Sequence, residues 1–353
     1  MASNVSNVAE RKSSGCYPDS MFDLAIIGAG PIGLEAAILA RKAGLNYVLL
    51  EKGAVTQAIV DYPTYMTFFT TSERLEIGNH PLITSTDKPT RKEALDYYRK
   101  VVQNEQLNLR SFNEVTGLER LSEGFQLTIC TDKRETKTLQ AARVAVATGY
   151  FDNPKLLGIP GEDLPNVSHY FTEAHPFYGR NVTIIGAGSS AADAALDLYR
   201  GGAKVTMVHR GEDFRHSLKY WIRPNLENRV KEGSITAHFN TTVREITPTD
   251  VIVQKQGEVL RIPTDQTFAL TGYSAGTSLL KQAGVIIDTE DKSAQHNEET
   301  FETNVPGLYV IGSAGYGVRT SDVFIENGLV HARKALADIV QKREKAKLAP
   351  VPA

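Results

Sequence analysis

The sequence predicts an α/β protein built from two Rossmann-like dinucleotide-binding domains, with the second domain inserted into the first. Three observations lead to this prediction. A glycine-rich motif stands between two apolar stretches at residues 25–53. The same pattern recurs without a gap at residues 183–211. Two further apolar stretches run into small residues, at 147–149 and 312–314, which would bring bare backbone to a nucleotide.

The first motif is typical of a strand, a glycine turn, a helix and a second strand. Gly28, Gly30 and Gly33 have GxGxxG spacing, and Glu51 ends the second strand. The first glycine permits a tight turn, the second lets backbone approach a pyrophosphate, and the third lets the helix pack on the strand. Glu51 stands where a carboxylate accepts hydrogen bonds from a ribose. The candidate residues of this first site are Gly28, Gly30, Pro31, Ile32, Gly33, Glu51, Lys52, Gln57, Ala147, Thr148, Gly149, Gly312, Ser313, Ala314 and Ile325.

The second motif differs from the first in its charge. Where the first has Glu51 and Lys52, the second has His209 and Arg210, and Arg215 follows shortly after. A carboxylate would repel a 2′-phosphate, whereas a guanidinium pairs with one through two parallel hydrogen bonds. The second site is therefore predicted to bind NADP(H). Its candidate residues are Gly186, Gly188, Ser189, Ser190, Ala191, His209, Arg210, Arg215 and Gly272.

The composition is that of an ordinary soluble globular protein. Of 353 residues, 41% are hydrophobic and 23% are charged, and the net charge of −2 gives no reason to expect nucleic acid or an anionic membrane as a partner. Cys16 and Cys130 are the two cysteines, so a disulfide framework is excluded and a cytoplasmic setting is expected. No apolar run approaches the roughly 20 residues that span a bilayer.

The predicted domains follow from these motifs. Residues 1–20 are polar, lack the apolar core of a signal peptide and are expected to form a disordered arm that carries Cys16 as an exposed thiol. The domain of the first dinucleotide site is assigned to residues 21–155 and 266–340, and the NADP-type domain to residues 156–265. Residues 341–353 are expected to be a flexible tail.

Together these features resemble the low-molecular-weight thioredoxin-reductase-like flavoproteins over residues 21–340. The stretches YPTYMTFFTTSERLEIG, HYFTEAHPFYGRNVTIIGAG, KYWIRPNLENRVKEGSI and FIENG are most similar to those of the bacillithiol disulfide reductases. The resemblance implies FAD in the first site, NADPH in the second, and a homodimer. It also implies domains that rotate about linkers near residues 154–161 and 263–272, so that the two substrates take turns at the flavin.

The chain departs from these families at two places. It has no CxxC pair, which thioredoxin reductases need to pass electrons to a protein disulfide. The bacillithiol-type enzymes carry a cysteine just before the third glycine of the first motif, and this chain has Ile32 there. Ile32 cannot perform the chemistry of a thiol.

The electron acceptor stays open at this stage. The first hypothesis is a low-molecular-weight disulfide such as bacillithiol disulfide, reduced without a protein thiol. The second is a ferredoxin- or flavodoxin-type carrier, and the third is a flavin monooxygenase, which lacks support because the FxG of its fingerprint is missing. A non-catalytic flavin redox sensor is a fourth, disfavoured by the NADP pocket. Tyr62, His175 and Glu326 are candidate proton donors by their place in family-like stretches.

Overall fold

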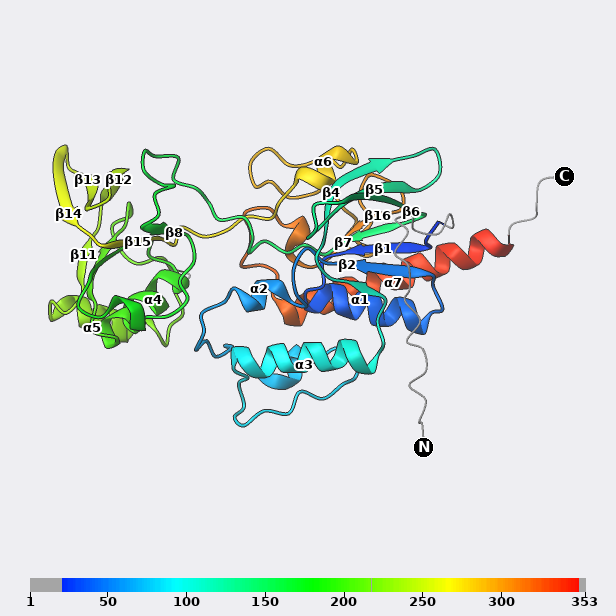
Figure 1. Ribbon diagram of the computed structural model, residues 1–353, viewed down its shortest axis with the longest axis horizontal. Helices are drawn as coiled ribbons and strands as arrows, with labels where there is room; N and C mark the ends of the chain where they lie inside the picture. The colour runs from blue at the N-terminus through cyan, green and yellow to red at the C-terminus, as the bar shows by residue number, and fades with distance from the viewer. Residues whose placement is uncertain (1–20, 217, 349–353) are drawn as a thin grey trace, which may run out of the picture.

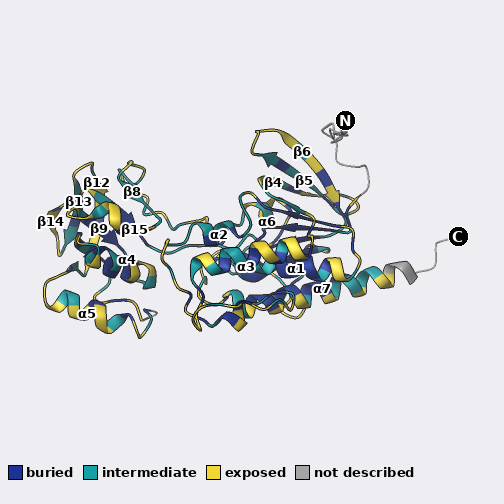
Figure 2. Cartoon of the chain, turned by 60° about the horizontal axis from the view of Figure 1, so that its bottom comes forward, coloured by how far each residue is buried: buried dark blue, intermediate teal, exposed yellow. Residues whose placement is uncertain are grey.

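The computed structural model describes residues 21–216 and 218–348, which form two lobes joined by two linker segments (Figure 1). Each lobe contains a five-stranded parallel sheet and a three-stranded antiparallel sheet. Buried residues follow the strands and the inner faces of the helices in both lobes (Figure 2). Within the described residues, no helix is long and apolar enough to cross a membrane.

The sheet of the first lobe is parallel throughout and buried on both faces. Its strands are short apolar runs, as expected where both faces are covered. Their order across the sheet is β16 (Leu308–Val310), β7 (Val144–Val146), β1 (Leu24–Ile27), β2 (Tyr47–Leu50) and β3 (Leu109–Arg110).

Two layers cover this sheet. On one face pack the helices α1 (Pro31–Lys42), α3 (Arg91–Asn104) and α7 (Ile325–Leu348). On the other face lie α6 (Ser278–Gln282) and an antiparallel sheet of β4 (Asn113–Arg120), β5 (Phe125–Thr131) and β6 (Thr136–Ala141). Short elements complete the lobe, namely α2 (Gln57–Val60) and the single 3₁₀ turns η1 (Ser72–Leu75) and η3 (Gly312–Gly315).

The second lobe repeats this plan. Its parallel sheet has the order β11 (Thr236–His238), β10 (Lys204–Val208), β9 (Asn181–Ile185), β15 (Gln266–Ala269) and β8 (Val167–Ser168). The helices α4 (Ser189–Arg200) and α5 (Arg223–Lys231) cover one face, and the 3₁₀ turn η2 (His175–Phe177) precedes β9. The antiparallel strands β12 (Thr241–Ile246), β13 (Asp250–Lys255) and β14 (Glu258–Pro263) cover the other. The fold class predicted from the glycine motifs is confirmed, and the internal repeat extends well beyond them.

One predicted domain boundary is wrong. The prediction placed residues 266–340 in the first domain, but β15 lies in the second sheet, where Thr267 pairs with Thr183 of β9. The chain therefore returns to the first lobe only after Ala269. There the two linkers meet, because Pro154 and Tyr273 form an antiparallel bridge and the rings of Phe151 and Tyr273 pack with their centroids 4.7 Å apart.

The predicted flexible tail is also wrong over its first residues, since α7 continues to Leu348. Lys342 ties this part of the helix to the sheet: its Nζ lies 2.5 Å from a Glu302 carboxylate oxygen and 2.7 Å from one of Asp338. Asp338 in turn accepts a hydrogen bond of 2.6 Å from the hydroxyl of Tyr309, a fully buried residue of β16. Residues 1–20, with Cys16, and residues 349–353 lie outside the described residues.

We predict that Lys342→Met lowers the free energy of unfolding by about 1 kcal/mol, because it leaves the Glu302 and Asp338 carboxylates without their shared cation. Urea denaturation of the two proteins measures the difference. Lys345→Met, an exposed lysine one turn of α7 further on, is the matched control and is expected to change nothing. Equal stability of the Lys342 variant and the control would contradict this account of the helix end.

Candidate functional site

The turn between β1 and α1 is closed by contacts that only glycine permits. A Cβ added to Gly33 would lie 1.9 Å from the carbonyl oxygen of Gly28. Gly28 has a φ of +104°, and a Cβ there would lie 2.6 Å from the carbonyl oxygen of Ala147, just beyond β7. Two of the three motif glycines are thus required by packing against protein backbone.

Gly30 is different, because a Cβ at this position would meet no atom within 4 Å. Gly30 is the N-cap of α1, which has no side-chain cap and no acidic residue in its first turn. The positive end of the helix dipole is therefore not neutralised by a side chain, and it faces a space free of protein atoms. Gly149 faces similar space, with a φ of +69° and its nearest neighbour, the Ser313 hydroxyl, at 4.0 Å. These features leave room for a phosphate group close to the backbone.

Glu51 lies beside this opening and is buried, with 6% of its surface exposed. Its carboxylate accepts hydrogen bonds from the backbone N–H of Ala29 at 2.7 Å and of Gly53 at 2.9 Å. Burial raises the pKa of Glu51 above its ordinary value, and the two N–H groups oppose that shift. The turn thus holds a carboxylate in place with acceptor capacity to spare for hydroxyl donors.

Lys52 and Gln57 lie near Glu51, but their polar groups are engaged with other residues. Lys52 forms an ion pair with Asp152 at 2.9 Å. The Gln57 side chain accepts a hydrogen bond from the backbone N–H of Ala54 and donates to Asp61. In the structure both side chains hold the loop after β2, and their predicted contacts with a cofactor stay predictions.

Ile32 precedes the third glycine of the first motif, the position at which a cysteine is expected in bacillithiol-type enzymes. Its side chain packs between the η3 turn and α7, so that a Cβ added to Gly312 would lie 3.1 Å from its Cγ1 and one added to Gly328 would lie 2.9 Å from its Cδ1. Ile325 at the start of α7 packs against the same apolar cluster. Ser313 and Ala314 follow Gly312 in η3. Ile32 therefore links the first glycine turn to the C-terminal turn by apolar contact.

The proton-donor candidates lie in different surroundings. The ring of Tyr62 is packed edge-on against that of Phe151 with centroids 4.8 Å apart, and burial raises the Tyr62 pKa well above its usual range. His175 lies in η2 of the second lobe, and Glu326 lies in the first turn of α7.

The turn between β9 and α4 has the same construction as the first. Gly186 has a φ of +137°, and a Cβ there would lie 2.3 Å from the carbonyl oxygen of Leu270, beyond β15. Ala191 is fully buried beneath this turn. Gly188 caps α4, whose first residues, Ser189 and Ser190, include no acid and no side-chain cap. The N-terminus of α4 therefore has no side-chain cap and no acidic neighbour in its first turn, like that of α1.

Positive charge gathers at the carboxyl end of the second sheet. His209 and Arg210 follow β10, and the Arg215 Cδ atom lies 3.9 Å from the position of a Cβ on Gly188. Burial, followed by the charges of Arg210 and Arg215, lowers the pKa of His209, which favours the uncharged imidazole. Gly272 also borders this edge, with a φ of +98° and no atom within 4 Å of a Cβ.

Sequence reasoning missed one residue of this edge, Lys155. Burial, Arg215 and Arg210 lower the pKa of its ammonium group, so the three cations are within electrostatic reach of one another. A single lysine in a linker rich in proline and glycine carries no sequence signal. Only the pairing of the two linkers brings Lys155 to the end of the second sheet.

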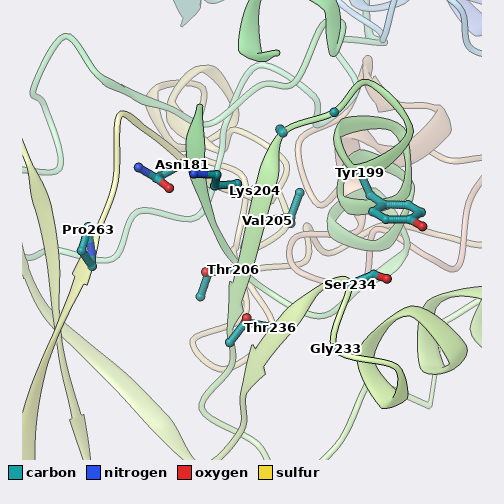
Figure 3. A pocket seen from close by; sticks show the side chains of 11 residues that line it. Asn181, Tyr199, Lys204, Val205, Thr206, Gly233, Ser234, Thr236 and Pro263 are labelled. Carbon is teal, nitrogen blue, oxygen red and sulfur yellow. The ribbon is translucent and has the colours of Figure 1, made fainter. Parts of the chain in front are cut away.

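The structure also contains a cavity of about 430 Å³ at the opposite end of the second sheet (Figure 3). It is lined mainly by residues at the amino ends of β9, β10 and β11, among them Asn181, Lys204 and Thr236. Ligands of doubly wound sheets bind at the carboxyl ends of the strands. This cavity therefore lies apart from the candidate nucleotide site.

Comparison with known proteins places the chain in a family. The family model described as pyridine nucleotide-disulphide oxidoreductase matches residues 25–312. The chain belongs to this family. It is an oxidoreductase, and the cofactors of the family are FAD and a nicotinamide dinucleotide.

Three relatives illustrate the similarity. The bacilliredoxin reductase Bdr of Bacillus subtilis is 40% identical over 318 residues, which cover 90% of this chain and 97% of that protein. The structure of the bacillithiol disulfide reductase Bdr from Bacillus cereus matches with a TM-score of 0.90 and 40% identity, over 92% of this chain and all of that one. The enzyme of the same name from Staphylococcus aureus matches with a TM-score of 0.85 and 39% identity, over 91% of this chain and 98% of that one.

The glycine contacts predict opposite behaviour for two neighbouring substitutions. Gly33→Ala is expected to lower the free energy of unfolding by several kcal/mol, because its Cβ would overlap the Gly28 carbonyl. Gly30→Ala is expected to leave the stability of the apoprotein within about 1 kcal/mol of wild type and to reduce the bound flavin. Urea denaturation of the apoproteins and flavin absorbance of the purified proteins measure the two effects. An apoprotein of Gly33→Ala as stable as that of Gly30→Ala would contradict the assignment of packing to one glycine and ligand approach to the other.

Proposed function

We propose that the chain transfers a hydride from NADPH to FAD and passes the electrons on to a low-molecular-weight disulfide. The observation that carries this proposal is the pair of similar turns with opposite charge beside them. The β1–α1 turn stands next to the Glu51 carboxylate, and the β9–α4 turn stands next to Arg210 and Arg215. A carboxylate suits a ribose with free hydroxyls, whereas two guanidinium groups suit a 2′-phosphate.

The residues around the first turn fit FAD. The open space at Gly30 and the uncapped N-terminus of α1 would receive the pyrophosphate, and Glu51 would accept hydrogen bonds from the adenosine ribose. Gly149, Gly312 and the apolar Ile32 would border the rest of the cofactor. The chain contributes binding, orientation and the exclusion of water here.

The residues around the second turn fit NADPH. The N-terminus of α4 at Gly188 would receive the pyrophosphate, while Arg210 and Arg215, whose Cδ lies 3.9 Å from a Cβ position on Gly188, would hold the 2′-phosphate. His209 would lie beside that phosphate as a hydrogen-bonding group. NADPH rather than NADH is therefore the proposed donor.

When bound, FAD supplies the two-electron chemistry, by which NADPH, a disulfide and one proton become NADP⁺ and two thiols. The chain itself offers no thiol at position 32, because Ile32 occupies it with apolar contacts. The cysteine among the described residues, Cys130, lies on β5 in the antiparallel layer, where its thiol contacts the Thr131 carbonyl. We therefore propose that the disulfide is reduced without a mixed disulfide to residue 32.

The choice of acceptor rests on the relatives. Two of them are described as bacillithiol disulfide reductases and one as a bacilliredoxin reductase. A bacillithiol-type disulfide is thus the proposed substrate, with a small redox protein as the second candidate. By likeness to the thioredoxin-reductase-like proteins, a homodimer is the proposed assembly.

Anaerobic titration of the purified flavoprotein with NADPH, followed by bacillithiol disulfide, tests this function. NADPH is expected to bleach the flavin, with NADH far less effective, and the disulfide is expected to restore the oxidised spectrum. Bleaching without reoxidation would contradict the disulfide assignment and favour a ferredoxin- or flavodoxin-type carrier or oxygen. Absence of bleaching would contradict the NADPH assignment itself.

Glu51 predicts a pH dependence of flavin binding. The carboxylate is the form that accepts hydrogen bonds from the ribose, and burial raises its pKa in the protein without flavin. Affinity for FAD should therefore be constant at neutral pH and should fall as the pH drops through this raised pKa. Flavin release at a series of pH values measures the effect. Glu51→Gln is expected to weaken binding about tenfold at pH 7 and to abolish this pH dependence. An unchanged pH profile in the variant would exclude Glu51 as its source.

A further inference from the structure

Lys155 belongs to the first linker, yet its backbone is fixed to the second. Its N–H donates to the carbonyl oxygen of Gly272 at 2.9 Å, and its own carbonyl accepts from the hydroxyl of Thr271 at 2.5 Å. The neighbouring Pro154 forms an antiparallel bridge with Tyr273. Three contacts in succession therefore hold this lysine against the chain that leaves β15.

The place where the linkers meet is also the edge of the nucleotide turn. β15 runs parallel to β9, and the carbonyl of Leu270, which follows β15, closes on Gly186. Gly272 lies two residues further on, with no atom within 4 Å of a Cβ position. Because the carboxyl ends of parallel strands meet at one edge of a sheet, Lys155 lies on the β15 side of the β9–α4 turn, the side opposite to β10.

The three cations at this edge, Lys155, Arg210 and Arg215, lack carboxylate partners among the described residues. In the part of the chain that the structure describes, no ion pair joins Lys155, Arg210 or Arg215 to an acidic side chain. Three acids of the adjoining segments have other partners: Asp152 pairs with Lys52, Asp213 pairs with Arg223, and Glu162 accepts the backbone N–H groups of Leu157 and Gly158. Like charges gathered without counter-charge repel one another, which is the arrangement expected of a site for a multivalent anion.

The β10 side and the β15 side of this edge are suited to different phosphate groups of the dinucleotide. Arg210 follows β10, the strand whose end receives the 2′-phosphate in a Rossmann site. Lys155 is carried by the linker beside β15, next to the helix N-terminus that receives the pyrophosphate. We propose that Lys155 binds the pyrophosphate of the nicotinamide dinucleotide from the interdomain linker. This inference rests on the proposed NADPH site and adds to it a residue outside both glycine motifs.

A consequence follows for the linker. The phosphates would bind the inserted domain through the N-terminus of α4 and the linker through Lys155 at once. An occupied site would then favour the linker pairing seen at Pro154 and Tyr273, so the nucleotide and the arrangement of the linkers would be coupled. This coupling requires the charge of residue 155 to reach the phosphates.

Calorimetric titration of the flavin-loaded Lys155→Met variant with NADP⁺ and with NAD⁺ tests the assignment. Both nucleotides carry the pyrophosphate, so both affinities are expected to fall by about tenfold, and by a similar factor. Arg210→Met is the comparison, and it is expected to weaken NADP⁺ alone. Lys204→Met, at the exposed amino end of β10, is the matched control and is expected to change neither affinity. Lys155→Arg is expected to retain most of the wild-type affinity.

The flavin content of each variant reports on the first lobe and its urea denaturation on the whole chain, so together they show that the fold is intact. An affinity of Lys155→Met for NADP⁺ within twofold of wild type would overturn the proposal, as would a loss confined to NADP⁺. These outcomes are distinct from a failure of the proposed function, in which the flavin of the wild-type protein is not reduced by NADPH.

Discussion

The contact between Gly33 and the carbonyl of Gly28 is the constraint on which the rest of the structure depends. At this point a helix touches the turn that precedes it so closely that a single methyl group would not fit. The contact fixes the angle at which α1 leaves the sheet and points its N-terminus over the end of β1. The N–H of Ala29 can then reach Glu51, and the space above Gly30 stays open. The turn between β9 and α4 is similar but less tight: the Leu270 carbonyl closes on Gly186 as the Ala147 carbonyl closes on Gly28, while Ala191 has a methyl group where Gly33 has none.

The two lobes therefore share a strand–turn–helix framework and differ in the charged residues that follow its second strand. In either lobe the helix N-terminus is suited to a pyrophosphate, and the charged residues select between a free ribose and a 2′-phosphate. In the proposed assignment, the Glu51 carboxylate would repel a further phosphate, whereas the Arg210 and Arg215 guanidinium groups would attract one. On this account the family's flavin and nicotinamide cofactors are sorted between two nearly equivalent folds by a few charges.

The sequence was sufficient for the parts of this structure that depend on near neighbours. The glycine spacings, the apolar strands and the charges at Glu51 and Arg210 are local, and they led to the fold class and to both turns. The errors arose where distant segments pair. Nothing in the local pattern of residues 266–269 reveals that they pair with β9. Likewise, the lysine-rich sequence of the C-terminal segment does not indicate that Lys342 forms ion pairs with Glu302 and Asp338. Lys155 was missed for the same reason, because the bridge between Pro154 and Tyr273 joins residues far apart in the chain.

The central claim is that the two turns are separate sites, one for each nucleotide. Calorimetric titration of the flavin-loaded protein with NADP⁺, with the flavin content measured before and after, tests it most directly. The account predicts one NADP⁺ bound per chain while all of the FAD stays in place. Displacement of FAD by NADP⁺, or binding of NADP⁺ only to protein freed of flavin, would show that the nucleotides compete for one site and would contradict the account.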